Sequence, residues 1–200
     1  MIHYSEVGQD IFALETAKHK SYIEIGGAYP HHINNTFLLE QNGWTGYSIE
    51  LDQKYEVEWH HKRKNKIYFE DAVTFIHPTQ SRIGYLSCDI NPPDLTFLAL
   101  KNVIEQGIHF DCITFEHDEY MRQERNYPDI CNKTKKYLLS VGYKIAVDNV
   151  YTIRRRRINN SKKKYPQKCY FETWYVNNDL EFNYSDYEDW KNDKQLLYKL

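Results

Sequence analysis

The sequence predicts an α/β fold with one seven-stranded, mostly parallel sheet. Short apolar runs alternate with stretches of helical character as far as residue 143. The first apolar run ends in an acid and is followed by two glycines, and a second run about two dozen residues later also ends in an acid. The last two runs are joined by a basic segment without a helical pattern, so we expect the final strand to lie antiparallel in the sheet.

Each element is expected from the local pattern of apolar and turn-forming residues. Asn34 or Asn35 is placed to cap the helix that follows the paired glycines, and Gly43 and Gly142 are placed to end helices. The expected strands are 21–25, 46–50, 67–69, 83–88, 110–115, 143–147 and 170–176. The expected helices are 9–18, 35–41, 93–106 and 129–140.

The composition suits a single domain that covers residues 1–200. With 41% hydrophobic and 27% charged residues, the chain has enough apolar surface for a core. No run approaches the roughly 20 apolar residues of a membrane span, and the first residues lack the basic and apolar regions of a signal peptide. The four cysteines are far apart and form no CxxC pair, which favours reduced thiols over a zinc site or a disulfide framework. We therefore expect a cytoplasmic protein that does not associate with membranes.

The strongest candidate for a ligand site is the turn after the first expected strand. Glu24 lies near the end of that strand, and Gly26 and Gly27 follow it. Open α/β sheets bind ligands at the carboxyl ends of their strands, where glycines let the backbone approach the ligand. The third glycine of a dinucleotide-binding loop is missing, which favours a cofactor without a pyrophosphate, such as S-adenosylmethionine. A left-handed turn would by itself also explain the two glycines.

Acids after the second and third expected strands extend this site. Glu50 ends the second strand and is placed to accept hydrogen bonds from the hydroxyls of a ribose. Asp71 follows the third strand and precedes the small residue Ala72, so we expect this pair beside an adenine, with Asp71 accepting from the exocyclic amine. The alternative for Asp71 is an exposed acid in a loop, which would be the better interpretation if this residue stood alone.

Ionisable residues also follow the fourth and fifth expected strands. Asp89 ends the fourth strand, where we expect it to touch the cofactor, and Glu116 and His117 end the fifth. These strands should be neighbours in a parallel sheet, which would bring the three side chains together. Two carboxylates and an imidazole are suitable ligands for Mg²⁺ or Mn²⁺, and such a cation would stabilise the alkoxide formed from a hydroxyl acceptor. In the alternative without a metal, His117 is the general base and Asp89 or Glu116 orients its ring.

A basic segment lies between the last two expected strands. Residues 154–157 are all arginine, and residues 162–164 are all lysine. A solvated hairpin loop is the interpretation that we favour. The alternative is a patch that attracts an anionic acceptor, such as a nucleotide-linked sugar or RNA. The formal net charge of −2 is not typical of a general nucleic-acid-binding protein.

Several short motifs together resemble the FkbM-type methyltransferases, in order and with similar spacing, over roughly residues 5–177. The resemblance implies a class I, Rossmann-like fold with strand order 3-2-1-4-5-7-6, S-adenosylmethionine as the cofactor, and O-methylation of a sugar or another small hydroxyl compound. The composition is also similar to the methyltransferase portion of chlorovirus glycan-modifying proteins, which would place the chain in a host cytoplasm. The motifs are GQD at 8–10, EIG at 24–26, NTFLLE at 35–40, GWTG at 43–46, IE at 49–50, YLSCD at 85–89, ITFEHD at 113–118 and ETWYV at 172–176.

Two features depart from this resemblance. The turn at Gly26 continues as Gly-Ala-Tyr-Pro, where many members of the family have a loop richer in Gly or Asp. Asn91-Pro92-Pro93 is similar to the start of the Asn/Asp-Pro-Pro-aromatic motif of enzymes that methylate amino groups of nucleic acids. Asp94 stands where that motif has the aromatic residue that stacks on a flipped base, which argues against such chemistry.

Three other functions stay open. A nucleic-acid methyltransferase is favoured by the Pro-Pro motif and the basic segment, and opposed by Asp94 and by the net charge. A catalytically silent glycan-binding domain would use the many Tyr and Trp residues, but it has no need of carboxylates at three strand ends, those of Glu50, Asp89 and Glu116. An NAD-dependent oxidoreductase is disfavoured by the missing third glycine. We therefore expect a sugar, glycan or nucleotide-sugar acceptor and no nucleic-acid partner. The sequence predicts neither the methylated hydroxyl nor the oligomeric state.

Overall fold

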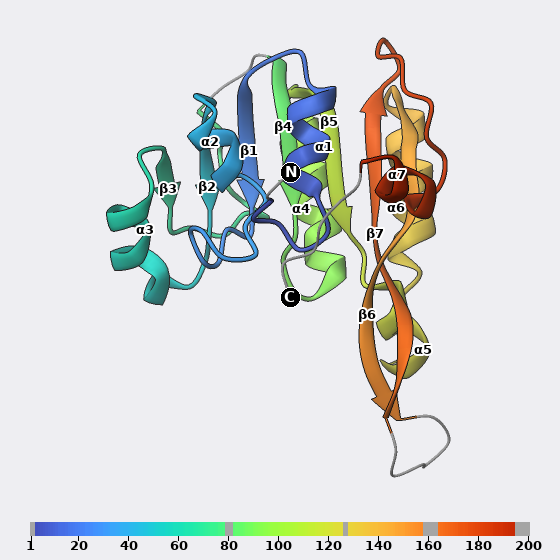
Figure 1. Ribbon diagram of the computed structural model, residues 1–200. Helices are drawn as coiled ribbons and strands as arrows, with labels where there is room; N and C mark the ends of the chain where they lie inside the picture. Colours follow the sequence, from blue (N-terminus) through green and yellow to red (C-terminus); the bar gives the residue numbers. More distant parts are fainter. Residues whose placement is uncertain (1–2, 79–81, 126–127, 158–163, 195–200) are drawn as a thin grey trace.

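The computed structural model describes residues 3–78, 82–125, 128–157 and 164–194. The strands in these residues are β1 Ser21–Ile25, β2 Thr45–Ile49, β3 Lys66–Tyr68, β4 Arg82–Cys88, β5 His109–Glu116, β6 Tyr143–Arg157 and β7 Lys164–Asn177. They form a sheet in the order β3-β2-β1-β4-β5-β7-β6 (Figure 1). The first five strands run parallel, and β7 lies antiparallel to both β5 and β6. The predicted α/β class, strand order and antiparallel last strand are confirmed.

Helices cover both faces of this sheet. They are α1 Gln9–Thr16, α2 Phe37–Gln41, α3 Glu56–Lys62, α4 Pro93–Glu105, α5 Glu119–Arg125, α6 Ile130–Ser140 and α7 Tyr187–Asp193, with a 3₁₀ turn η1 at Gln53–Tyr55. Side chains of α1, α2 and α7 share one hydrophobic cluster with Tyr22 and Trp174 of the sheet. Those of α4 and α6 share the cluster on the other face with Ile23 and Phe115. Among the described residues, no helix has the length and apolar character needed to cross a membrane.

The four predicted helices are confirmed as α1, α2, α4 and α6. The sequence analysis did not predict α3, α5 and α7, which have seven residues each. Asn34, and not Asn35, provides the side-chain acceptor at the start of α2. Its Oδ1 accepts hydrogen bonds from the backbone N–H groups of Thr36 at 3.0 Å and Phe37 at 2.8 Å. Gly43 and Gly142 have φ of +78° and +95°, the left-handed conformation expected just beyond a helix.

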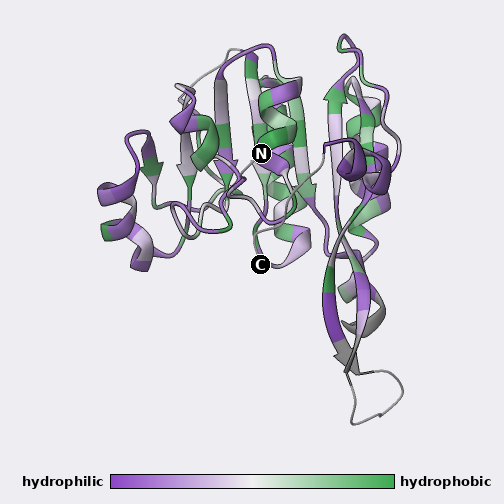
Figure 2. Cartoon of the chain, in the orientation of Figure 1, coloured by the Kyte–Doolittle hydropathy of each residue, from purple (hydrophilic) through white to green (hydrophobic). Residues whose placement is uncertain are grey.

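The β6–β7 hairpin is longer than the sequence predicts. β6 pairs with β7 as far as Arg157 and Lys164, whereas β5 pairs with β7 only between Glu172 and Val176. The outer part of the hairpin therefore reaches beyond the carboxyl ends of the parallel strands (Figure 1), and Figure 2 shows long hydrophilic stretches along it. We call its strand residues 151–157 and 164–170 the basic arm. The sequence analysis placed 154–157 in a loop because arginines give no apolar strand pattern, and residues 158–163 lie outside the described residues.

Candidate functional site

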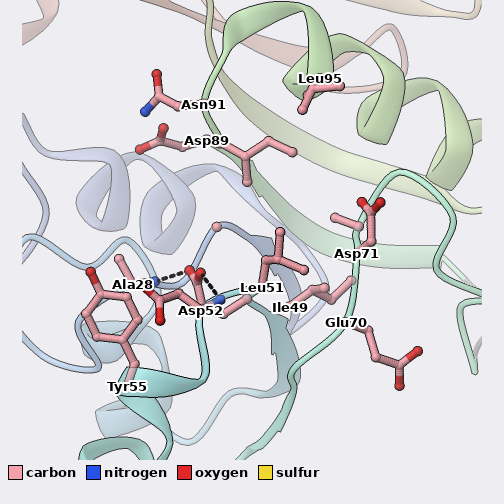
Figure 3. Close-up of a pocket in the computed structure, with 14 residues that line it drawn as sticks. Ala28, Ile49, Leu51, Asp52, Tyr55, Glu70, Asp71, Asp89, Asn91 and Leu95 are labelled. Carbon is pink, nitrogen blue, oxygen red and sulfur yellow. Dashed lines mark hydrogen bonds between the residues drawn. The ribbon is translucent and has the colours of Figure 1, made fainter.

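A cavity of about 490 Å³ opens at the carboxyl ends of β1, β2 and β4 (Figure 3). Its volume lies in the range of small-molecule and cofactor sites. Leu51, Tyr55 and Leu95 give it apolar and aromatic walls, whereas the predicted residues Glu24 and Gly27 do not line it. Five residues predicted to bind the cofactor do line the cavity, namely Gly26, Glu50, Asp71, Ala72 and Asp89.

Gly26 lets β1 turn directly against the end of β4. Its φ is +86°, and a Cβ atom at this position would collide with the backbone oxygen of Asp89. Its N–H donates to the carbonyl oxygen of Ile49 at 2.9 Å, so the turn is held against β2 as well. Only glycine satisfies both the left-handed conformation and this close approach, which leaves the turn as a backbone cradle at the edge of the cavity.

Glu50 organises the cavity wall opposite Asp89. One carboxylate oxygen accepts from the Ala28 N–H and the other from the Asp52 N–H, both at 2.9 Å (Figure 3). A carboxylate has about four lone-pair sites, so Glu50 retains acceptor capacity toward the cavity after these two bonds. Asp71 uses one oxygen to accept from the N–H of Val73 at 2.9 Å and is otherwise exposed. These acceptors suit the hydroxyl and amine donors of a nucleoside.

Glu24 lies beneath the cavity wall and not in it. Its side chain is 2% exposed and accepts from Ser48 Oγ at 2.6 Å and from Thr36 Oγ1 at 2.9 Å. Burial raises the pKa of Glu24, and the nearby Arg63 guanidinium opposes that shift. Arg63, which the sequence analysis did not single out, also donates to the carbonyl oxygen of Pro30 at 3.0 Å. Glu24 and Arg63 thus brace the glycine turn and the loop that follows it.

The strand register brings Asp89 and Glu116 together at the sheet edge. Cys88 of β4 lies opposite Phe115 of β5, so the next residues, Asp89 and Glu116, are neighbours on one face. The two side chains share a hydrogen bond. Burial raises the pKa of Asp89 to about 6. Burial and the Asp89 charge hold the pKa of Glu116 well above its usual value, so the pair retains a shared proton near neutral pH.

Glu172 continues this row into β7, where it lies directly opposite Glu116. It accepts from the indole N–H of Trp174 at 2.6 Å and from the side-chain amide of Gln9 at 3.0 Å. Burial nevertheless raises the pKa of Glu172 to about 8. Glu116 and Glu172 therefore hold protons near neutral pH, where isolated carboxyl groups would be charged, whereas Asp89 between them and the cavity is ionised above about pH 6.

His117 does not join the carboxyl pair. Side chains alternate along a strand, so His117 faces the side of the sheet opposite to Glu116. Its Nδ1 accepts from the N–H of Glu119 at 3.2 Å, and its Nε2 lies 3.1 Å from Thr173 Oγ1. Burial lowers its pKa to about 3, which keeps the ring neutral.

The metal centre predicted from Asp89, Glu116 and His117 is therefore wrong. The described part of the chain contains no group of three His, Cys, Asp or Glu side chains arranged to hold a metal ion. The physical reason is the alternation of consecutive strand residues, which separates the imidazole from the two carboxyl groups.

The same fold occurs in several solved structures. M. capricolum TrmK in complex with S-adenosylhomocysteine has a TM-score of 0.54 at 13% identity, over 92% of this chain and 72% of that one. An rRNA methylase from Streptococcus thermophilus has a TM-score of 0.52 at 11% identity, over 88% and 98% of the two chains. Magnesium protoporphyrin IX methyltransferase from Synechocystis PCC 6803 with bound S-adenosylmethionine has a TM-score of 0.50 at 12% identity, over 86% and 76%. The chain has the class I methyltransferase fold.

No protein-family model matches the sequence, and neither does any curated protein. The narrower resemblance to FkbM-type enzymes and to the chlorovirus proteins stays a prediction. The class I methyltransferase fold explains why Gly26, Glu50 and Asp89 meet at one edge, since they end three adjacent parallel strands. It does not explain Glu172 and Asp118, which the sequence analysis did not single out as site residues. Glu172 lies inside a strand, where an acid is expected to be exposed, so only the register reveals it.

Proposed function

We propose that the protein is an S-adenosylmethionine-dependent methyltransferase that methylates a hydroxyl group of a sugar, a glycan or a similar small molecule. The observation that carries the proposal is the double position of Asp89. It lines the cofactor cavity and also shares a hydrogen bond with Glu116. A proton acceptor therefore lies where a methyl acceptor would meet the cofactor.

The cavity residues divide between cofactor binding and proton transfer. Gly26 provides the backbone cradle, Glu50 the acceptor for ribose hydroxyls, and Asp71 with Ala72 the surface beside the adenine. S-adenosylmethionine, when bound, supplies a methyl group that its sulfonium already makes electrophilic. The protein then needs to align the acceptor and remove its proton.

The carboxyl pair suits proton removal from a hydroxyl. A sugar hydroxyl is a poor nucleophile because its pKa lies far above neutrality. Asp89, ionised above about pH 6, accepts the hydroxyl proton as the oxygen becomes bonded to the methyl group. The hydrogen bond from Glu116 holds Asp89 in place during this step. His117 supports the end of β5 from the other face.

The test of this proposal has two stages. Calorimetric titration with S-adenosylhomocysteine measures whether the cavity binds the cofactor product, which a silent glycan-binding domain would not do. Incubation with S-adenosylmethionine and sugars, glycans or nucleotide sugars, followed by mass analysis, then identifies an acceptor that gains one methyl group. Binding without any methylated acceptor across these classes would contradict the proposed reaction.

A nucleic-acid methyltransferase is the second candidate, and the basic arm favours it. Arg155 and Lys168 are exposed on the arm, and seven of the eight basic residues between 150 and 170 lie in 154–157 and 162–164. One of the similar structures, the methylase from Streptococcus thermophilus, is of an enzyme named for rRNA. Methylation of RNA by the parent and its loss in Arg155→Ala/Lys168→Ala, with Lys62→Ala/Lys136→Ala as a charge-matched control, would favour this candidate.

A further inference from the structure

Five carboxyl groups gather beyond the cofactor cavity, and we call them the carboxyl cluster. They come from four separate parts of the chain. Asp89 follows β4, Glu116 ends β5 and Asp118 lies just after it, Glu172 belongs to β7, and Glu6 precedes α1. The negative charges of Glu6 and Asp118 both act on Asp89. Asp118 also acts on Glu116, and Glu6 also acts on Glu172, so each member lies within electrostatic range of at least two others.

Asp118 gives this cluster an unsatisfied acceptor. The residue is 4% exposed, and the Tyr120 hydroxyl forms a hydrogen bond with its carboxylate, whereas its Oδ1 is buried without a hydrogen-bond partner among the described residues. Its backbone is held in the left-handed region at φ +47°, and its N–H donates to the carbonyl oxygen of Phe171 at 3.0 Å. A buried carboxylate oxygen is costly without a donor, and the fixed backbone prevents it from turning away. The geometry points to a donor supplied by a ligand.

The residues that the structure describes supply little positive charge to the cluster. Arg154 is the cation that approaches it, donating to the hydroxyl of Tyr120 at 2.8 Å and lying 4.0 Å from Glu6. Lys135 pairs with Asp148 on the His117 side of the sheet instead, at 2.8 Å. Burial, together with the charges of Asp89 and Asp118, raises the pKa of Glu116, so a proton offsets part of the remaining negative charge.

We propose that the carboxyl cluster binds the protonated amine of the methyl acceptor, so that the substrate is an amino sugar with a free amine near the hydroxyl that is methylated. This inference rests on the proposed function. An ammonium group carries a full positive charge and three donors, which match several carboxylate oxygens including the Oδ1 of Asp118.

A metal ion and the ammonium group of the cofactor fit the carboxyl cluster less well than the amine of the acceptor. The cluster residues do not form a set of metal ligands, as the described residues contain no such group. The ammonium group of the cofactor is also a poor match, because Asp89 is the cluster member that lines the cofactor cavity and the other four do not. The acceptor is the remaining ligand that reaches the whole cluster.

The test is a calorimetric titration of the protein saturated with S-adenosylhomocysteine, at about pH 7, with three matched sugars. D-glucosamine carries a free amine, N-acetyl-D-glucosamine carries the same nitrogen without charge, and D-glucose has a hydroxyl in its place. We expect glucosamine to bind at least about tenfold more tightly than the other two. It should also release protons, because a cation beside the cluster lowers the pKa values of its carboxyl groups. Repeating the titration in buffers of different ionisation enthalpy measures that release.

Asp118→Asn provides the matched variant. Asparagine has nearly the same shape and tolerates the left-handed backbone, so the fold is retained while the charge is removed. We expect this variant to lose the preference for glucosamine and to bind S-adenosylhomocysteine as the parent does. Glu105→Gln, which removes an exposed acid at the far end of α4, should keep the preference.

The outcomes separate this inference from the proposed function. Equal or absent binding of the three sugars, tighter binding of N-acetylglucosamine, or an unchanged preference in Asp118→Asn would overturn the amine site and leave the cofactor site intact. Failure to bind S-adenosylhomocysteine would instead contradict the proposed function itself.

Discussion

Asp89 and Glu116 lie side by side at the ends of β4 and β5, where their carboxyl groups share a hydrogen bond. This contact joins the cofactor cavity, which Asp89 lines, to the carboxyl groups farther along the sheet edge. It follows directly from the register of two parallel strands, since their last paired residues are Cys88 and Phe115. Under the proposed function, Asp89 is the proton acceptor beside the cofactor, and neither a metal ion nor His117 takes part.

Glu50→Ala should weaken binding of S-adenosylhomocysteine by about 1–3 kcal/mol, because two ribose hydroxyls lose their acceptor. The loop should also loosen, since Glu50 accepts from the N–H groups of Ala28 and Asp52. Calorimetric titration measures the change, with Glu105→Ala as the control for loss of an acid elsewhere. Affinity equal to that of the parent would show that Glu50 does not hold the ribose.

Gly26→Ala should destabilise the fold more than Gly107→Ala. Both glycines have positive φ, +86° and +82°, so both variants incur the left-handed penalty of about 1–2 kcal/mol. A Cβ at Gly107 meets no atom within 4 Å, whereas at Gly26 it collides with Asp89. We expect the collision at Gly26 to lower the free energy of unfolding by about 1–3 kcal/mol more, the cost of overpacking in a protein core. Urea denaturation of both variants measures the difference, and equal losses would contradict the close approach.

Glu172→Gln should stabilise the protein at neutral pH and flatten its pH dependence. The folded-state pKa of Glu172 is about 8, above the unfolded value near 4.5, so the folded state binds the extra proton between these values. The free energy of unfolding should then fall as pH rises through this window, by about 1.4 kcal/mol per pH unit for this group. Glutamine needs no proton, and its carbonyl still accepts from Trp174 and Gln9.

The measurement is chemical denaturation of the parent and Glu172→Gln at several pH values between about 5 and 8. Other buried groups contribute to both curves, so the difference between the curves isolates Glu172. Glu105→Gln, an exposed substitution, should leave the slope unchanged. Parallel curves for the parent and Glu172→Gln would show that Glu172 is ionised in the folded protein.

The sequence predicts the sheet and the edge at which the cavity opens, because both depend on local patterns. Apolar runs define the parallel strands, and strand ends in an α/β sheet meet at one edge, which correctly places Gly26, Glu50 and Asp89. The sequence analysis fails where the place of a residue in the site depends on the direction of its side chain. Glu116 and His117 are adjacent in the sequence, but the pleat of β5 turns them to opposite faces.

Longer-range features also escape the sequence. Arg63 reaches Glu24 and the glycine loop from a residue after α3, and no local pattern links them. The length of the basic arm depends on hydrogen bonds between β6 and β7, which charged residues form as readily as apolar ones. Glu172 lies beside Glu116 only because antiparallel pairing sets the two residues opposite each other.

The rate of methyl transfer in Asp89→Asn and His117→Asn, followed as a function of pH, tests the role of the carboxyl pair most directly. The parent rate should rise as pH increases through about 6, because Asp89 accepts a proton only when ionised. Asp89→Asn should lose about 10²–10⁴-fold in kcat and this pH dependence. His117→Asn should keep both the rate and the profile per folded molecule, although its stability falls. Full activity in Asp89→Asn, or a comparable loss in His117→Asn, would contradict proton transfer to the carboxyl pair.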